Sequence, residues 1–176
     1  DVLGKLSPDP SEGAAEDHEL LQQATRALQS QFDASHGGFG GAPKFPMPNA
    51  LLRLLRHWAH ARRSGDRDSE ALDMVMISLT QMARGGIYDH LGGGFCRYAT
   101  DRKWMIPHFE KMLYNQAQLA RVFIEAWEIT AATAYRRAAE RIFAYVIRDM
   151  TDAHGAFYAA EDADSRDVSG ELEEGV

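Results

Sequence analysis

Apolar side chains recur every three to four residues in five segments of the chain, a spacing typical of helices that pack through one face. The segments cover residues 16–32, 48–62, 68–83, 107–127 and 133–150. Pro48 and Pro107 suit the first turn of the second and fourth helices, while Asp68 and Thr133 suit the caps of the third and fifth. No segment alternates convincingly between apolar and polar residues, so the pattern predicts an all-α fold.

The connections between these helices alternate in length. Long loops rich in glycine and aromatic residues follow the first, third and fifth helices, whereas the second and fourth helices run into the next through a few residues. Stacked antiparallel hairpins connected in this way place every long loop at the same end of the molecule. The first helix is expected to pack through one apolar face, formed by Leu20, Ala24, Ala27, Leu28 and Phe32.

The three long loops also resemble one another. They share a short pattern of glycines before an aromatic residue, which recurs at intervals of roughly 55 to 60 residues in Gly37-Gly38-Phe39, Gly93-Gly94-Phe95 and Gly155-Ala156-Phe157. This period of two helices is longer than the roughly 33 to 47 residues of helical solenoid units. The sequence therefore predicts helical hairpin repeats that form part, about half, of a closed toroid.

The composition is that of an ordinary globular protein, since 45% of the 176 residues are hydrophobic and 26% are charged. Cys96 is the single cysteine, so the chain can form no internal disulfide, CxxC redox pair or cysteine-built zinc site. A reducing, cytoplasmic location is the expectation. No stretch reaches the roughly 20 apolar residues of a membrane span, and we expect no membrane partner.

The net charge of −7 is concentrated at the end of the chain, where residues 161–176 hold seven acidic residues and one basic residue, Arg166. Because no net basic surface remains to neutralise phosphates, we expect no nucleic-acid partner. The chain starts at Asp1 without a methionine and stops after this acidic segment. We expect it to be a fragment of a longer protein.

Several longer motifs carry a resemblance to a known family: Lys44-Phe45-Pro46, GIYDHLGGGF at residues 86–95, PHFEKMLY at residues 107–114 and EDADS at residues 161–165. With these motifs the chain resembles the thioredoxin-domain-containing protein family that includes bacterial YyaL and the mammalian spermatogenesis-associated homologue. The resemblance covers nearly all of residues 37–176.

In that family a thioredoxin-like domain precedes an (α/α)6 toroid similar to N-acylglucosamine 2-epimerases and six-hairpin glycosidases. The resemblance implies that residues 1–176 are the first part of this barrel domain, and that the thioredoxin-like domain, a partner within the full-length protein, is not in the chain. It brings no catalytic assignment with it, because a shared fold does not establish a shared function.

Most candidate chemistry lies in the loop after the third helix and at the predicted start of the fourth. A sugar site needs aromatic faces for the ring, polar groups for the hydroxyls and a titratable pair for proton transfer. For proton transfer we expect His108 together with Asp89 or Asp162. The expected substrate-binding residues are His90, Arg97, Tyr98, Asp101, Trp104, Glu110 and Asp164.

Structural roles compete with these assignments. His108 and His90 can be structural histidines bonded to the backbone, and Arg97 and Asp101 can form an ion pair that pins the loop. Lys111 suits a solvated position on the predicted helix. Cys96 suits a small buried position, and the three loop phenylalanines, Phe39, Phe95 and Phe157, suit equivalent core positions.

No metal or cofactor site is expected. The acidic third loop departs from a calcium loop at Arg166 and Asp167, and the chain has no HExxH, Walker A or dinucleotide-binding glycine motif. His108 and Glu110 form an HxE pair, but the PCxxC motif of the zinc deaminases is missing.

The sequence thus leaves three functions open. The first is a carbohydrate-active or carbohydrate-binding toroid, similar to an epimerase or glycosidase, that takes a sugar-like small molecule. The second is a non-catalytic module that binds client proteins for the thioredoxin-like domain. The third is a scaffold in which the polar loop residues only join the repeats together.

Overall fold

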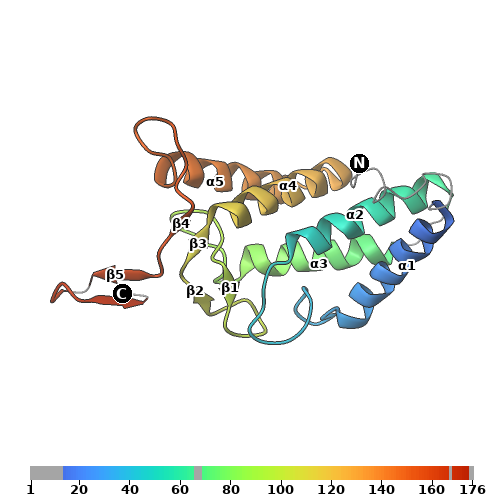
Figure 1. The fold of residues 1–176 in the computed structure, drawn as a ribbon, viewed down its shortest axis with the longest axis horizontal. Coiled ribbons are helices and arrows are strands. Elements are labelled where there is room, and N and C mark those ends of the chain that lie inside the picture. Colours follow the sequence, from blue (N-terminus) through green and yellow to red (C-terminus); the bar gives the residue numbers. More distant parts are fainter. Residues whose placement is uncertain (1–13, 66–68, 167, 175–176) are drawn as a thin grey trace, which may run out of the picture.

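The computed structural model describes residues 14–65, 69–166 and 168–174. Its framework is five helices: α1 (Ala14–Gln31), α2 (Pro48–Arg63), α3 (Glu70–Arg84), α4 (Leu113–Thr130) and α5 (Thr133–Asp149). Helix α2 packs against α3 and α4, and α4 forms a close hairpin with α5 (Figure 1). The predicted all-α fold of stacked helical hairpins is confirmed.

The helix boundaries agree with the predicted start signals only in part. Pro48 occupies the start of α2, where its missing N–H costs no hydrogen bond. Thr133 is the first residue of α5, but Ala132 holds the cap position and no side chain caps the helix. The predicted cap Asp68 lies outside the described residues, and α3 begins at Glu70.

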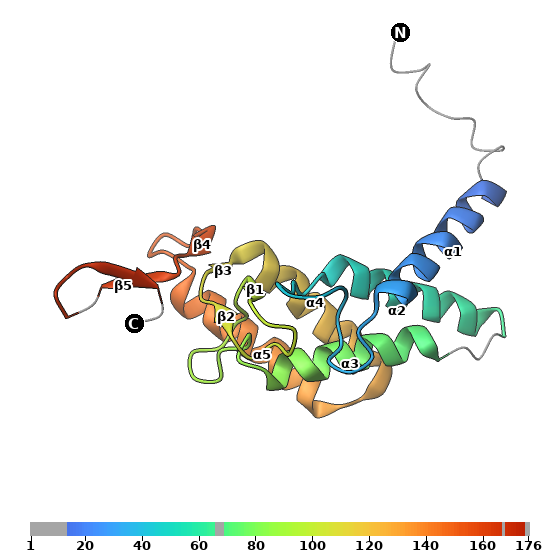
Figure 2. The ribbon, with the colours of Figure 1, turned by 90° about the horizontal axis from the view of Figure 1, so that it is seen from below.

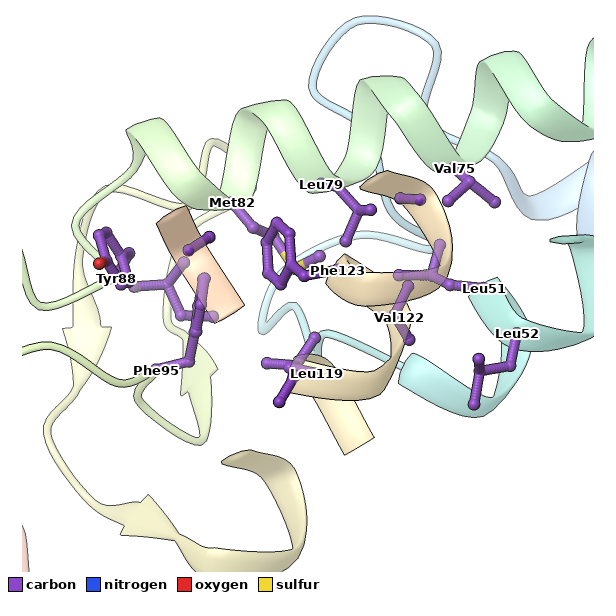
Figure 3. Close-up of a cluster of buried hydrophobic side chains, with 14 of the residues drawn as sticks. Leu51, Leu52, Val75, Leu79, Met82, Tyr88, Phe95, Leu119, Val122 and Phe123 are labelled. Atoms are coloured by element: carbon purple, nitrogen blue, oxygen red, sulfur yellow. The ribbon is translucent and has the colours of Figure 1, made fainter. Parts of the chain in front are cut away.

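The core lies where α2, α3 and α4 meet (Figure 3). Leu51, Val75, Leu79, Leu119 and Phe123 are fully buried there, and these five come from all three helices. Burying a large apolar side chain contributes roughly 1.5 to 3 kcal/mol, so each of these five residues stabilises the packing of the three helices.

Gln116 is the polar interruption in the apolar stripe of α4. Its side chain is fully buried, and it forms two hydrogen bonds with the backbone of Phe95. The Gln116 Oε1 accepts from the Phe95 amide at 2.8 Å, and Nε2 donates to the Phe95 carbonyl at 2.6 Å. This pairing joins the loop after α3 to α4 and satisfies polar groups that would otherwise be buried without partners.

Helix α1 is less buried than its periodicity predicted. Leu20 is 60% exposed, and Ala24 and Ala27 are exposed as well. Leu28 and Phe32, in contrast, pack against the core. Figure 2 shows the N-terminal half of α1 projecting away from the other helices. The prediction of a fully packed face was wrong for this half, because periodicity shows which face is apolar but not whether a neighbour covers it.

The described residues also contain six short strands, which the sequence did not predict: β1 (Tyr98–Ala99), β2 (Pro107–His108), β3 (Lys111–Met112), β4 (Ala160–Glu161), β5 (Asp164–Arg166) and β6 (Leu172–Glu174). They form three antiparallel pairs, β1 with β2, β3 with β4 and β5 with β6. The prediction that a helix starts at Pro107 was therefore wrong. Strands β2 and β3 occupy this segment instead, and α4 begins only at Leu113.

The three long loops share one backbone arrangement, so the internal repeat is confirmed. Each loop is closed by an antiparallel bridge between a residue after the helix and the loop phenylalanine: Phe32 with Phe39, Tyr88 with Phe95, and Thr151 with Phe157. Phe39 and Phe95 are buried as predicted, whereas Phe157 is exposed.

An aspartate follows the start of each bridge, at Asp33, Asp89 and Asp152. In each case Oδ1 accepts hydrogen bonds from two backbone amides within the next four residues. Such an arrangement mimics a backbone turn and fixes the start of the loop. The second carboxylate oxygen remains available for other partners, and it is here that the three repeats differ.

Glycine is required at the same position of the first two loops. Gly37 and Gly93 have φ values of +69° and +87°. A Cβ atom would lie 2.7 Å from Ser78 Cα at Gly37, and 2.9 Å from the Arg141 carbonyl oxygen at Gly93. Each loop is therefore pressed against a helix, α3 for the first and α5 for the second, at a distance that excludes any side chain.

Candidate functional site

The first loop contains a buried ion pair between Asp33 and Lys44. Lys44 Nζ lies 2.7 Å from Asp33 Oδ2, and both side chains are at most 1% exposed. Arg102 donates from Nε to the same carboxylate oxygen at 2.6 Å. The centre of the Trp104 ring lies 5.2 Å from Lys44 Nζ. Asp33 is thus paired with two cations, and an indole ring packs against the lysine.

The second loop repeats this ion pair with Asp89 and Lys111. Lys111 Nζ lies 2.9 Å from Asp89 Oδ2, with the lysine side chain 10% exposed and the aspartate side chain 31% exposed. The centre of the Tyr145 ring lies 4.4 Å from Lys111 Nζ, so Tyr145 takes the place that Trp104 has beside Lys44. Among the described residues, no arginine forms an ion pair with Asp89 as Arg102 does with Asp33.

The two lysines also have equivalent backbone partners. Lys44 forms an isolated antiparallel bridge with Ala99 of the second loop. Lys111 pairs in the same way with Glu161 of the third loop. Each lysine therefore joins its own loop to the next one, and the two Asp–Lys pairs are copies of one structural unit.

Both aspartates have lowered pKa values. The Arg102 guanidinium holds the pKa of Asp33 far below its ordinary value, against the opposing effect of burial, and Lys44 adds to this effect. Burial alone would raise the pKa of Asp89, but hydrogen bonds from Lys111 and from the Gly92 and Leu91 amides outweigh it and lower the pKa. Both carboxylates are charged at neutral pH.

The second Asp–Lys pair opens onto a cavity of about 460 Å³ at the loop end of the helices. The charged groups of its lining are Asp89, Lys111, Glu161 and Asp162. The remaining lining residues are Gly86, Tyr88, His90, Leu91, Cys96, Phe109, Ala163 and Ser165. Aromatic rings, carboxylates and an ammonium group thus surround one concave space, as in small polar ligand sites.

Tyr145 positions Glu161 at the edge of this cavity. The buried Tyr145 hydroxyl donates a hydrogen bond to Glu161 Oε2, and Lys111 Nζ lies 3.9 Å from the same oxygen. Burial and this carboxylate raise the pKa of Tyr145, so the phenol stays neutral and acts as a donor. Burial raises the pKa of the Cys96 thiol to about 11, so Cys96 is not a nucleophile at neutral pH.

The predicted catalytic residues fall in two places. Asp89 and Asp162 line the cavity together with His90, whereas His108 is not part of the lining. His108 Nδ1 instead lies 2.6 Å from Glu174 Oε1, and its ring stacks on Tyr98 at 4.8 Å. The structure therefore brings the two aspartates together and does not bring the histidine to them.

His108 belongs to a separate cluster on the β1–β2 hairpin. Arg97 Nη1 pairs with Glu110 Oε2 at 2.7 Å, and His108 Nε2 lies 3.8 Å from that oxygen. The expected alternative partner of Arg97, Asp101, is not used. Asp101 accepts backbone hydrogen bonds from Lys103, Met105 and Ile106 and so closes the hairpin turn.

Two further predicted binding residues lie away from the cavity. Trp104 has no exposed surface, and its Nε1 donates to the His36 carbonyl at 2.8 Å. Its ring packs within the core and is not available for stacking on a sugar, which corrects the assignment from sequence. Asp164 lies on the exposed strand β5, paired in register with Glu174 of β6.

Sequence reasoning overlooked the roles of Lys111, Glu161 and Tyr145. The expectation of a solvated helix position for Lys111 was wrong, because the structure makes it the centre of the second ion pair. A usable signal existed, since the lysines of Lys44-Phe45-Pro46 and Lys111-Met112-Leu113 both precede a helix and follow a repeated loop. Tyr145 gave no such signal, because it lies within an ordinary amphipathic helix.

Neither a metal-binding cluster nor a membrane-spanning helix is found among the described residues. Within the ranges that the structure describes, no group of three His, Cys, Asp or Glu side chains is arranged to hold a metal ion. No helix in those ranges is long and apolar enough to cross a membrane.

The fold defines the class of protein. A family 76 glycoside hydrolase from a bovine Bacteroides thetaiotaomicron strain superposes with a TM-score of 0.67 and 15% identity, over 93% of this chain and 35% of that one. The cellobiose 2-epimerase of Spirochaeta thermophila superposes with a TM-score of 0.65 and 17% identity, over 86% and 41%. The chain thus has the fold of part of an (α/α)6 toroid.

The relatives found by sequence comparison are more similar to the chain than these structural neighbours are. The chain is homologous to spermatogenesis-associated protein 20, with 46% identity to the Mus musculus protein over 156 residues and 44% to the Homo sapiens protein. An uncharacterized Caenorhabditis elegans protein is 36% identical over 93% of the chain. The chain spans about a fifth of the length of the mammalian relatives, 19% in both cases. No family model matches the chain.

Proposed function

We propose that this chain supplies part of the sugar site of a carbohydrate-active toroid, similar to an epimerase or glycosidase. One observation carries the proposal: the cavity at the loop end combines three carboxylates, an ammonium group and aromatic rings around about 460 Å³. Pyranose rings are recognised by this mixture of polar and aromatic groups. The structural neighbours named as a cellobiose 2-epimerase and a glycoside hydrolase support the sugar class.

Within the cavity the residues divide into two roles. Asp89 and Lys111 form a preorganised ion pair and hold substrate hydroxyls. Glu161 and Asp162 are adjacent in the chain and both line the cavity, so they are the carboxylates assigned to proton transfer and to charged hydrogen bonds with the bound sugar. The Tyr145 hydroxyl and Lys111 hold Glu161 in place, which is a positioning role.

Titration calorimetry on the protein at its natural full length tests this assignment. Hexoses, amino sugars and short glycans form the panel, and at least one class is expected to bind. Asp162→Asn should weaken the binding about tenfold or more, the usual effect of losing a charged hydrogen bond. Asp164→Asn, which changes a carboxylate two residues away on exposed β5, is the matched control. A panel in which no sugar binds would refute the proposal.

A second function is favoured by one specific observation. Four large apolar side chains are exposed on the segment between α3 and α4, namely Leu91, Met105, Ile106 and Phe109. Exposed apolar surface is typical of protein docking sites, and these four side chains come from one segment of the chain. The alternative proposal is a non-catalytic module that presents client proteins to a thioredoxin-like domain of the full-length protein.

The two functions differ in what a cavity mutant does. If the chain only binds clients, replacing Asp89 and His108 by alanine leaves redox activity on clients unchanged, and no sugar binds. If the cavity is a sugar site, Asp162→Asn weakens sugar binding about tenfold or more. Ile106→Ser, which changes an exposed apolar residue outside the cavity lining, leaves the binding intact.

A further inference from the structure

The two Asp–Lys pairs differ in whether a second cation is bound to the aspartate, and this difference indicates what the cavity binds. In the first repeat Asp33 Oδ2 accepts from two cations, Lys44 Nζ at 2.7 Å and Arg102 Nε at 2.6 Å. In the second repeat Asp89 Oδ2 accepts from Lys111 Nζ at 2.9 Å. No second cation reaches Asp89 within ion-pair distance among the residues that the structure describes.

The surroundings of the two carboxylates share their turn hydrogen bonds and the buried lysine, but His36 Nδ1 also lies 3.5 Å from Asp33 Oδ2, and Gly92 takes the equivalent position beside Asp89. In both, Oδ1 accepts from two backbone amides. In both, the lysine is buried beside an aromatic ring, Trp104 in the first repeat and Tyr145 in the second. Asp89 Oδ2 therefore keeps acceptor capacity at the place where Asp33 Oδ2 accepts from the permanent cation Arg102.

Arg148 does not fill this place. It lies on α5 near the second loop, and the charge of Asp89 is one of the causes that raise its pKa, but its Nη2 donates to the Gly92 carbonyl at 2.7 Å and not to Asp89. Its guanidinium also pairs with the neighbouring Asp149. Asp89 lines the cavity, and its side chain is 31% exposed against 1% for Asp33.

The charge of the cavity lining also favours a cationic ligand. Its lining holds three carboxylates, Asp89, Glu161 and Asp162, and one ammonium group, Lys111. Three negative charges against one positive charge leave a formal charge of −2 with His90 neutral. A cationic donor gains from this field, whereas a phosphorylated or carboxylated ligand is repelled by it.

We infer that the cavity takes a cationic, amine-bearing sugar, whose ammonium group bonds to Asp89 Oδ2 in the position that the Arg102 guanidinium occupies on Asp33. The inference rests on the proposed sugar-binding function and narrows its substrate class to amino sugars. The aromatic rings and Lys111 contact the rest of the sugar, and the ammonium group completes the second ion-pair unit as Arg102 completes the first.

Calorimetry on the full-length wild-type protein tests this inference without any mutation. Glucosamine, galactosamine and mannosamine are compared, at a pH where their amines are protonated, with the parent hexoses and with the N-acetylated sugars. The free amino sugars should bind about tenfold or more tightly than both neutral series, the usual effect of one charge-assisted hydrogen bond. Equal binding of neutral and amino sugars would overturn the inference but leave the proposed function standing. Absence of binding by all three series would overturn both.

Two variants test whether Asp89 causes the preference for amino sugars. Asp89→Asn should reduce the preference for amino sugars to about twofold or less while neutral sugars still bind, because an amide keeps an acceptor but loses the charge. Asp152→Asn is the matched control, since it changes the equivalent aspartate of the third loop, which does not line the cavity. Its preference should match the wild type. An unchanged preference in folded Asp89→Asn protein, with folding checked by circular dichroism, would contradict the role of Asp89.

Discussion

Lys111 Nζ lies 2.9 Å from Asp89 Oδ2. This ion pair repeats, one helical hairpin further along the chain, the pair that Lys44 forms with Asp33. The first copy is sealed by Arg102 and lies in the core, whereas the second opens onto the cavity. One structural unit thus serves stability in the first loop and contributes to the candidate site in the second. A buried ion pair whose hydrogen-bonding groups are all satisfied fixes one arrangement of the loop. A partly exposed ion pair keeps hydrogen-bonding groups that a ligand can reach.

The three equivalent aspartates should differ in their contribution to stability. Asp33→Ala leaves Lys44 buried without its carboxylate and should lower the free energy of unfolding by about 3 to 5 kcal/mol. Asp89→Ala should cost less because its site is partly exposed, and Asp152→Ala should cost only about 1 kcal/mol for its turn hydrogen bonds. Urea unfolding of the three variants measures the order. Equal losses at all three positions would contradict the assignment of Asp33 as the sealed copy.

Gly93 should not tolerate a side chain. Its φ is +87°, and a Cβ atom at this position would lie 2.9 Å from the Arg141 carbonyl oxygen. Gly93→Ala should therefore lower the free energy of unfolding by about 2 to 4 kcal/mol. Gly40→Ala is the control and should cost only about 1 kcal/mol, since Gly40 also has positive φ but has nothing within 4 Å of a Cβ position. Thermal or urea unfolding of the two variants separates backbone strain from the clash with α5.

Stability should fall in acid through the carboxylates with lowered pKa values. Asp33, Asp89 and Asp101 have lower pKa values in the folded protein than the ordinary value of about 3.9 in the unfolded chain. Their stabilisation is therefore fully present above about pH 5 and is lost as the pH falls below about 4 towards the folded values. Melting temperatures measured from about pH 7 to about pH 3 should show this loss. Asp33→Asn, although less stable, should show a weaker dependence over the same range.

Cys96 should be unreactive until the protein unfolds. Its side chain is buried, and burial raises the pKa of its thiol to about 11. At neutral pH a thiol-labelling reagent should therefore react slowly with the native protein and rapidly in denaturant. Because the chain has one cysteine, the labelling rate reports directly on the opening of the second loop. Rapid labelling of the native protein would show that this loop opens readily.

His108 should matter for the hairpin contact and not for ligand binding. His108→Ala removes the contact between β2 and Glu174 but changes no residue of the cavity lining. Sugar affinity measured by calorimetry should stay within about twofold of the wild type. A loss of sugar affinity of tenfold or more would show that His108 takes part in binding, and would contradict its separation from the cavity.

The fold was accessible from sequence because its signals are local. Helical periodicity located five helices, and the recurrence of a glycine-rich loop before each phenylalanine indicated a hairpin repeat. The same local signals failed at residues 107–112, where a proline that suits a helix start lies in a strand. Pairing with strands elsewhere in the loops outweighs local preference there.

The candidate site was only partly accessible. The sequence singled out the right segment, with Asp89, His90 and Asp162 among its candidates, because long polar loops in a compact domain are often functional. The sequence analysis also placed His108 and Trp104 in this site, because they are close in the sequence to Asp89 and His90 and the direction of a side chain cannot be derived from sequence. The structure turns Trp104 into the core and His108 towards Glu174.

By itself the sequence determined the all-helical architecture, the repeat and the end of the molecule where the polar loops gather. These features can be predicted because helical periodicity and turn residues depend on a few neighbouring positions. Tertiary structure alone decided which loop residues share a space. The partners of Lys111, at Asp89 and Glu161, come from two loops that are separated in the sequence by α4 and α5. An ion pair of this kind depends on the packing of those helices, and no local pattern encodes it.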